Sequence, residues 1–134
     1  MDCSAVLALC FEDEDGEYAE KLLEYYIDGA AIAPEIWPVE VSNSLLNAVK
    51  RKRLTKAEAN HFFHLVASLP IEIVAGNRAL DSYISLYELA CLYNLSSYDA
   101  SYLSLAMDKG YSLATLDQKL IDAAASAGVG IFGR

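Results

Sequence analysis

The chain has 134 residues, of which 54% are hydrophobic, and a formal net charge of −9. This length is typical of one domain, and the high apolar content without any low-complexity run excludes an intrinsically disordered chain. The longest apolar stretches, such as residues 5–11, are far shorter than the roughly 20 residues that span a bilayer, and no basic leader precedes them. We therefore expect a cytoplasmic protein with no membrane contact. The acidic charge disfavours nonspecific nucleic-acid binding, but it does not exclude a nuclease whose acids bind cations.

Apolar runs and helical spacing alternate along the chain, which predicts an α/β domain with a parallel sheet. Helices are predicted over residues 4–11, 16–28, 34–53, 55–68, 78–93, 96–108 and 117–127, and strands over residues 30–33, 71–74, 112–115 and 130–132. The acidic run 12–15 is expected to form a loop and a first helical turn. Because there is no internal repeat and no long linker, residues 1–134 are interpreted as a single domain.

Several predicted helix boundaries depend on individual residues. Gly29 is expected to end the second helix, and Pro34 suits the opening turn of the third. Thr55 followed three residues later by Glu58 is a capping box, which predicts the start of the fourth helix.

Cysteine and histidine residues give no clear metal site. The three cysteines, Cys3, Cys10 and Cys91, lack metal-ligand spacing, so we interpret them as reduced thiols buried like small hydrophobic side chains. His61 and His64 lie three residues apart on a predicted helix. A metal pair is one interpretation, but surface or partly packed histidines are favoured because no third ligand accompanies them.

Three aspartates lie at the predicted end of a strand or start of a helix, where parallel sheets bind their ligands. Asp117 follows a predicted strand, Asp2 precedes a helix, and Asp99 lies in the first turn of a helix that opens at Ser96. Each also has a purely structural interpretation. Ser96 and Asp99 resemble a capping box, Asp117 suits an N-cap, and Asp2 suits a disordered terminal residue.

Glu40 differs from these because it lies inside a predicted helix. Asn43 and Asn47 share its face, so a polar stripe interrupts an otherwise apolar helix. A carboxylate in such a stripe is more informative than one in an acidic surface run, although an exposed edge position is the alternative. None of the four acids is decisive alone, so the hypothesis depends on their combination.

Four segments, 2–9, 34–46, 98–106 and 114–120, resemble the PIN-domain family, and particularly the toxin ribonucleases of VapBC toxin–antitoxin pairs. They occur in the family's order and together extend over nearly the whole chain. The resemblance implies a three-layer α/β/α PIN-like domain with a central, mostly parallel sheet. It also implies one pocket formed by Asp2, Glu40, Asp99 and Asp117, with Ser4, Asn43 and Thr115 at accessory positions.

The function implied by this resemblance is a divalent-metal-dependent endoribonuclease, a hydrolase that leaves 5′-phosphate and 3′-hydroxyl ends. Two carboxylates about 4 Å apart repel by about 4 kcal/mol at an effective dielectric near 20, so four converging acids need protonation or a cation. Oxygen ligands suit Mg²⁺ or Mn²⁺, which would orient the phosphate and activate a water. The resemblance further implies RNA as substrate, a cognate antitoxin as partner, and a homodimer.

A basic run of four residues is a candidate RNA contact. It has a structural alternative, because cations also favour the C-terminal end of a helix. The run consists of Lys50, Arg51, Lys52 and Arg53.

The amino end departs from the family pattern, since the family usually has a full first strand before its leading aspartate and here only Met1 precedes Asp2. Either the first strand is nearly absent, or the chain is truncated or begins at a misassigned start. A charged amino terminus beside the pocket would compete with metal. The alternative functions are a catalytically inactive PIN-like module that binds RNA or protein, and a phosphatase-like enzyme, which the lack of a glycine-rich phosphate loop disfavours.

Overall fold

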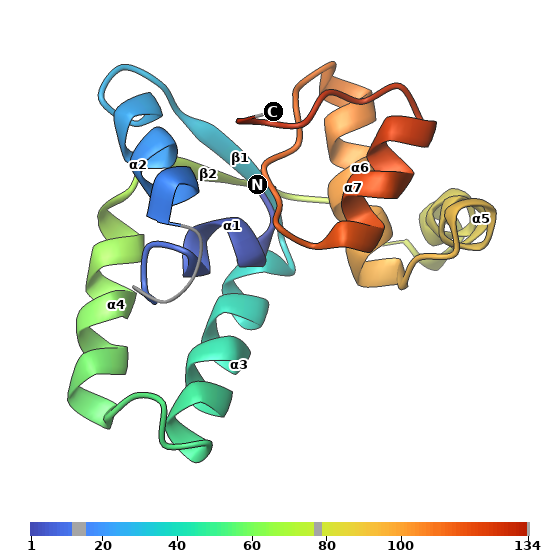
Figure 1. The fold of residues 1–134 in the computed structure, drawn as a ribbon. Coiled ribbons are helices and arrows are strands. Elements are labelled where there is room, and N and C mark those ends of the chain that lie inside the picture. Colours follow the sequence, from blue (N-terminus) through green and yellow to red (C-terminus); the bar gives the residue numbers. More distant parts are fainter. Residues whose placement is uncertain (12–15, 77–78, 134) are drawn as a thin grey trace.

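The computed structural model describes residues 1–11, 16–76 and 79–133, and it has the expected α/β architecture (Figure 1). The predicted loop at 12–15 and the predicted helix start at residue 78 lie outside the described residues. The elements in chain order are α1 (Cys3–Leu7), α2 (Gly16–Tyr25), β1 (Ala31–Pro34), α3 (Trp37–Lys50), α4 (Lys56–Ser68), β2 (Ile71–Val74), the 3₁₀ helix η1 (Leu80–Tyr83), α5 (Ile84–Tyr93), α6 (Ser97–Lys109) and α7 (Gln118–Ser126).

The helix boundaries follow local signals in the sequence. Thr55 and Glu58 form the predicted capping box, in which the Thr55 Oγ1 accepts the Glu58 N–H and the Glu58 carboxylate accepts the Thr55 N–H. Gly29 is required by space, because a Cβ at this position would lie 2.6 Å from the carbonyl oxygen of Tyr25. Gly110 ends α6 with a φ of 66°, in the left-handed region that favours glycine.

The central sheet is parallel and partly irregular. β1 and β2 pair in parallel, with Ala33 opposite Ile73. Beyond β1, the Met1 amino group donates to the Ile32 carbonyl at 2.7 Å, and the Asp2 N–H donates to the Ala114 carbonyl at 2.9 Å. Residues 1–2 therefore join β1 to the segment around residue 114.

The strands predicted at 112–115 and 130–132 are not formed as strands. Instead, a single parallel bridge joins Leu113 to Ile131, and only β1 and β2 form a ladder among the described residues. The described bonds across this bridge are both made by Leu113, whose N–H donates to the Gly130 carbonyl and whose carbonyl accepts the Phe132 N–H.

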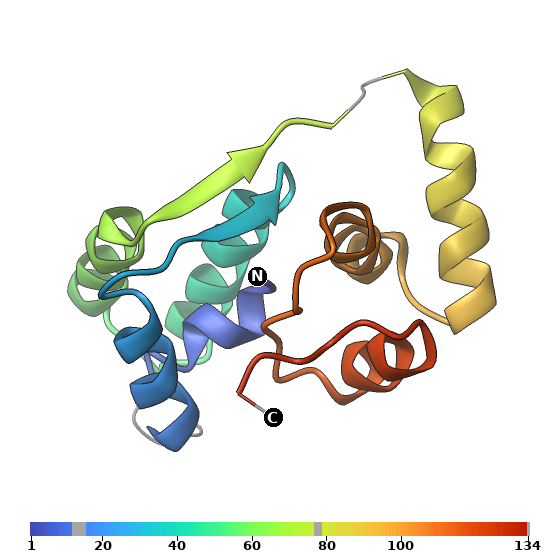
Figure 2. The same cartoon turned by 90° about the horizontal axis from the view of Figure 1, so that it is seen from above.

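Helices cover the sheet, and the three-layer α/β/α architecture is confirmed (Figures 1 and 2). α6 contacts β1 and α7, whereas α1 packs on α3 and α3 packs on α4. Fully buried side chains from several of these elements form the core: Val6, Leu22, Leu45, Tyr102, Leu103, Leu113 and Leu120. No helix in the described ranges combines the length and apolarity needed to cross a bilayer.

The helix predicted over 78–93 is divided, because η1 precedes α5. Both lie at the outer edge of the molecule, where α5 packs against α6 (Figure 2). Ala90 is the buried residue of α5, and Cys91 is exposed. The prediction of burial is therefore correct for Cys3 and Cys10 and wrong for Cys91, which lies on α5, where Ala90 is the residue that is buried.

Candidate active site

Asp2 is held firmly at the N-terminal end of α1. Its Oδ1 accepts the Cys3 N–H at 2.6 Å, and its Oδ2 accepts the Ser4 hydroxyl at 2.5 Å and the Thr115 hydroxyl at 2.8 Å. The residue is only 7% exposed. The alternative of a disordered terminal residue is therefore wrong, because three donors fix this carboxylate.

Thr115 and Ser4 connect Asp2 to the start of α7. The Thr115 hydroxyl, which donates to Asp2, also accepts the Asp117 N–H at 3.1 Å, and Ser4 Oγ lies 3.3 Å from it. Ser4 Oγ accepts the Leu116 N–H at 2.9 Å. Two of the three accessory residues thus contact Asp2 directly, whereas Asn43 is exposed on α3.

Glu40 lies in the first turn of α3 and is half-buried, so the alternative of an exposed edge position is wrong. The Tyr102 hydroxyl of α6 donates a hydrogen bond to Glu40 Oε2. Burial raises the pKa of Glu40, and the negative charges of Asp2 and Asp99 raise this pKa further, against the opposing effect of the Tyr102 hydrogen bond. Glu40 therefore lies within electrostatic reach of two of the other predicted acids.

Tyr102 was not identified as a site residue from the sequence, where it resembles a core aromatic side chain. It is indeed 1% exposed. The signal that could have identified it is its spacing, because Tyr102 follows Asp99 by three residues and therefore shares its face of α6.

Asp99 and Asp117 both cap helices, so the structural interpretation of each is correct. Asp99 accepts the Ser96 hydroxyl at 2.7 Å, and its own N–H donates to Ser96 Oγ at 3.1 Å. Asp117 Oδ1 accepts the Leu120 N–H at 3.0 Å, and Asp117 is exposed. Capping and metal binding are compatible, since a carboxylate retains free lone pairs after accepting one hydrogen bond.

Within the described ranges, no group of three or more histidine, cysteine, aspartate or glutamate side chains is arranged to hold a metal ion. Asp2, Glu40, Asp99 and Asp117 are each turned toward a protein donor instead. The convergence of all four acids on one ion thus stays a prediction. Their chemistry suits a hard divalent cation, because carboxylate oxygens are its preferred ligands.

The amino terminus lies close to these acids. Met1 is 8% exposed, and burial lowers the pKa of its ammonium group to about 6, although the nearby Asp2 carboxylate acts in the opposite direction. At a pH below about 6 this group is charged and would repel a cation bound by the acids, whereas at higher pH the neutral amine would not.

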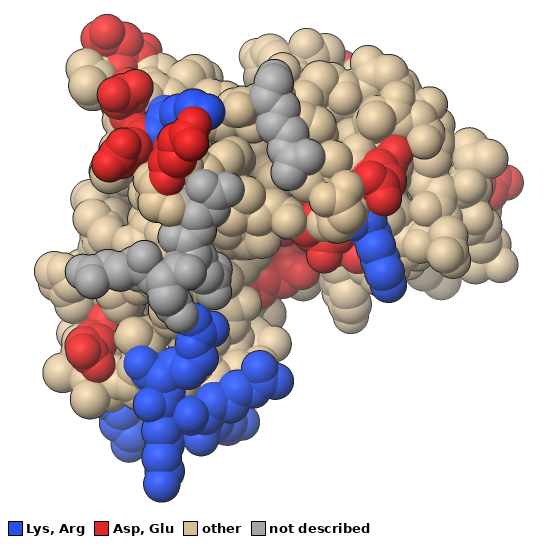
Figure 3. All heavy atoms as spheres, viewed as in Figure 1, with Lys and Arg blue, Asp and Glu red and all other residues tan. Residues whose placement is uncertain are grey.

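Acidic and basic side chains occupy different parts of the face shown in Figure 3. Acidic side chains lie in the hollow between α3 and the α6–α7 half, whereas Lys and Arg gather beyond the C-terminal end of α3. All four residues of the predicted basic run, 50–53, are exposed, and the Arg53 guanidinium lies 4.4 Å from the centre of the Phe11 ring. His61 and His64 are exposed on α4, as the preferred interpretation expected.

The chain matches the PIN domain family over residues 1–126 and belongs to this family. PIN domains are generally nucleases that use divalent metals. Among solved structures, it is similar to PAE2754 from Pyrobaculum aerophilum, with a TM-score of 0.67 and 24% sequence identity over 91% of this chain and 76% of that chain. At this identity the likeness supports the fold alone. No curated protein matches the chain.

Proposed function

We propose that this protein is a divalent-metal-dependent endoribonuclease that hydrolyses RNA phosphodiester bonds, with Asp2, Glu40, Asp99 and Asp117 as its catalytic acids. One observation carries the proposal. Glu40 is half-buried on α3 and accepts the hydroxyl of Tyr102, which lies one turn after Asp99 on α6. Burial raises the pKa of Glu40, and the negative charges of Asp2 and Asp99 act in the same direction. A bound cation relieves such repulsion, and RNA hydrolysis is a reaction that a cation at this position can serve.

Mg²⁺ or Mn²⁺ is the cofactor that these oxygen ligands suit, and the four acids would hold it. When bound, such an ion supplies charge for the phosphate oxygens and lowers the pKa of an attacking water. The protein's own contribution is to orient the ligands. Thr115 and Ser4 hold the Asp2 carboxylate, and the Tyr102 hydroxyl holds Glu40.

The basic run 50–53 is proposed to contact the RNA backbone. Its side chains are exposed beyond the end of α3, and Glu40 lies in the first turn of the same helix. An RNA strand lying along α3 would therefore reach both the basic run and the acids. Phosphate contacts of this kind position a substrate without reading its sequence.

We further propose that the protein is the toxin of a type II toxin–antitoxin pair and forms a homodimer. The support is an apolar surface on η1 and α5, which the described fold leaves open: Leu80 is 85% exposed, Leu92 73%, Tyr87 65% and Ile84 57%. Apolar surface of this kind is typical of protein interfaces. Sedimentation equilibrium tests the dimer, and co-expression with the product of the neighbouring reading frame tests the antitoxin.

The decisive experiment compares RNA cleavage by wild type, Asp99→Asn and Asp108→Asn in Mg²⁺ or Mn²⁺. The asparagine at position 99 keeps an acceptor for Ser96, so the helix cap and the fold are retained, while the charge is lost. Asp108 lies exposed on the same helix and is the matched control. We expect Asp108→Asn to cleave like wild type and Asp99→Asn to be inactive. Equal cleavage by all three would refute the assignment, and RNA binding without cleavage by wild type would indicate a catalytically inactive module.

A further inference from the structure

Tyr98 lies in the first turn of α6 and presents its aromatic ring to solvent. The residue is 60% exposed, whereas Tyr102, one turn later on the same helix, is 1% exposed. None of the aromatic pairs among the described residues includes Tyr98, so no neighbouring ring of that part of the chain covers it. Single exposed rings are common on protein surfaces, so the position of Tyr98 decides whether it has a role.

The position of Tyr98 is beside the candidate active site. Tyr98 is adjacent in sequence to Asp99 and precedes Tyr102 by four residues. Residues four apart lie on the same face of a helix, so the side chains of Tyr98 and Tyr102 leave α6 in the same direction. The Tyr102 hydroxyl donates to Glu40 on α3. The Tyr98 ring therefore lies one helical turn from the contact between α6 and Glu40, on the face of α6 that makes this contact.

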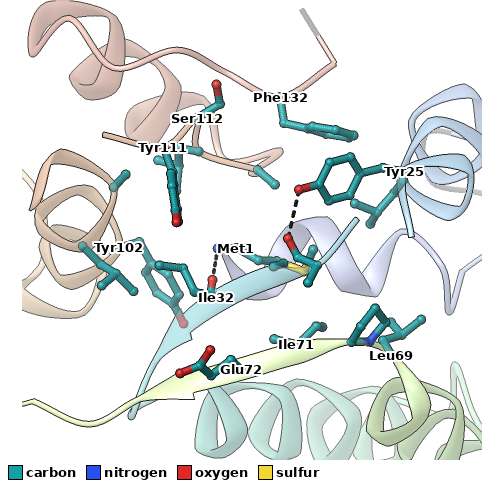
Figure 4. Close-up of a pocket in the computed structure, with 18 of the residues that line it drawn as sticks. Met1, Tyr25, Ile32, Leu69, Ile71, Glu72, Tyr102, Tyr111, Ser112 and Phe132 are labelled. Atoms are coloured by element: carbon teal, nitrogen blue, oxygen red, sulfur yellow. Dashed lines mark hydrogen bonds between the residues drawn. The ribbon is translucent and has the colours of Figure 1, made fainter. Parts of the chain in front are cut away.

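Two other tyrosines among the described residues are more than half exposed, and neither is next to a proposed catalytic acid in the sequence. Tyr87, which is 65% exposed, belongs to the apolar surface of η1 and α5. Tyr111, which is 57% exposed, follows Gly110 at the opposite end of α6, where it lines a cavity of about 970 Å³ beside β1 (Figure 4). Tyr98 is thus the exposed tyrosine that adjoins a proposed acid, and Tyr111 is a matched control beyond the other end of the same helix.

Negative charge beside Tyr98 disfavours phosphate contacts at this point. The chain carries a net charge of −9, and the charges of Asp2 and Asp99 both raise the pKa of Glu40. The basic run 50–53 begins ten residues after Glu40 on α3, which is about 15 Å along a helix. A base stacked on an aromatic ring adds affinity without adding charge, so stacking is the contact that suits RNA beside the acids.

We propose that Tyr98 is the stacking platform for the RNA base next to the phosphate that the enzyme cuts. This inference rests on the proposed function, because it takes RNA as the substrate. With the base on the Tyr98 ring, the adjoining phosphate would lie beside Asp99, the next residue of α6. Stacking on an aromatic ring accepts every base, so Tyr98 would strengthen RNA binding at the acids without selecting a sequence.

Binding of a fluorescein-labelled single-stranded RNA, measured by anisotropy in EDTA, tests the proposal on the full chain. The proteins compared are wild type, Tyr98→Ala, Tyr98→Phe and Tyr111→Ala. We expect Tyr98→Ala to weaken binding by about 5- to 150-fold, which corresponds to the loss of one stacked base. Tyr98→Phe keeps the ring and should bind like wild type, as should Tyr111→Ala. Because Tyr98 is exposed, Tyr98→Ala should keep the Tm of wild type.

Two further measurements separate stacking on Tyr98 from other effects of the substitution. The slope of log affinity against log salt should be the same for Tyr98→Ala and wild type, because stacking releases no counterions. An abasic strand of the same length offers no base to stack. Wild type and Tyr98→Ala should therefore bind the abasic strand equally, so that the difference between the two proteins appears with bases and disappears without them.

Equal binding of the RNA by wild type and Tyr98→Ala would overturn the proposal, as would weaker binding of the abasic strand by Tyr98→Ala or no RNA binding by wild type. An equal loss of affinity in Tyr111→Ala would assign the effect to exposed rings in general, which also overturns it. EDTA removes divalent metal, so none of these measurements depends on cleavage. The nuclease proposal fails separately, if wild type binds RNA through Tyr98 but does not cut it in Mg²⁺ or Mn²⁺.

Discussion

Replacing Thr115 with valine tests the arrangement around Asp2 most specifically. The Thr115 side chain is 1% exposed, and its hydroxyl donates to Asp2 Oδ2 while accepting the Asp117 N–H. Valine has nearly the same shape and keeps the packing, but it can neither donate to Asp2 nor accept the Asp117 N–H. The substitution therefore measures the effect of the hydroxyl separately from the packing of the rest of the side chain.

The loss of stability in the Thr115→Val variant is estimated from the hydrogen bonds that the hydroxyl makes. A hydrogen bond to a charged group contributes about 1.5–3 kcal/mol, and the Asp117 N–H would also lose its acceptor. We expect a loss of about 2–3 kcal/mol in the free energy of unfolding, which lowers Tm by about 6–12 °C for a domain of this size. Because Thr115 orients a proposed ligand, Mn²⁺ affinity should also fall by about 10- to 100-fold.

Urea denaturation and calorimetric Mn²⁺ titration measure the two effects. Thr115→Ser is the control, since it keeps the hydroxyl and removes one buried methyl group at a cost of about 1 kcal/mol. If the valine variant proves as stable as the serine variant, the hydroxyl does not stabilise Asp2 and the reasoning is wrong.

Three further predictions concern helix capping, pH and charge. Thr55→Ala should lower the free energy of unfolding by about 1 kcal/mol in urea denaturation, since it removes the cap of α4, and an unchanged midpoint would contradict the capping box. Because burial lowers the pKa of the Met1 ammonium from 8.0 to about 6, stability should rise between pH 6 and pH 8 by up to about 2 kcal/mol. Acetylation of Met1 should abolish this rise, and an identical rise after acetylation would assign it to another group. Arg51→Ala with Lys52→Ala should reduce the slope of log affinity for single-stranded RNA against log salt by about 1.4 in filter binding, whereas an unchanged slope would exclude the phosphate contact.

Local signals predicted most of the helices and two of the strands. The pairing of Thr55 with Glu58 fixed the start of α4, and the run 71–74 became β2 with the predicted bounds. Such features depend on neighbours within four residues, so the sequence displays them directly. The run 112–115 had the same apolar character as a strand, but strand formation also depends on pairing with a distant segment, and among the described residues this run forms a single bridge, between Leu113 and Ile131.

The contacts of the candidate site residues were predicted in part for a similar reason, whereas their role in metal binding stays a prediction. The caps formed by Asp99 and Asp117 are local and were recognised as one interpretation of each residue. The contact between Tyr102 and Glu40 joins residues 62 positions apart, and no short-range pattern specifies it. Asp2 was open to interpretation as a disordered terminal residue because its anchor, Thr115, lies 113 positions away along the chain.

Binding of Mn²⁺ measured by titration calorimetry tests the central claim most directly, namely that the acids act together on one cation. The comparison is between wild type, Glu40→Gln, and Glu88→Gln as an exposed control on α5. We predict that wild type and Glu88→Gln bind Mn²⁺ with equal affinity and that Glu40→Gln binds at least about tenfold more weakly. Equal binding by all three proteins, or no binding by wild type, would contradict the account.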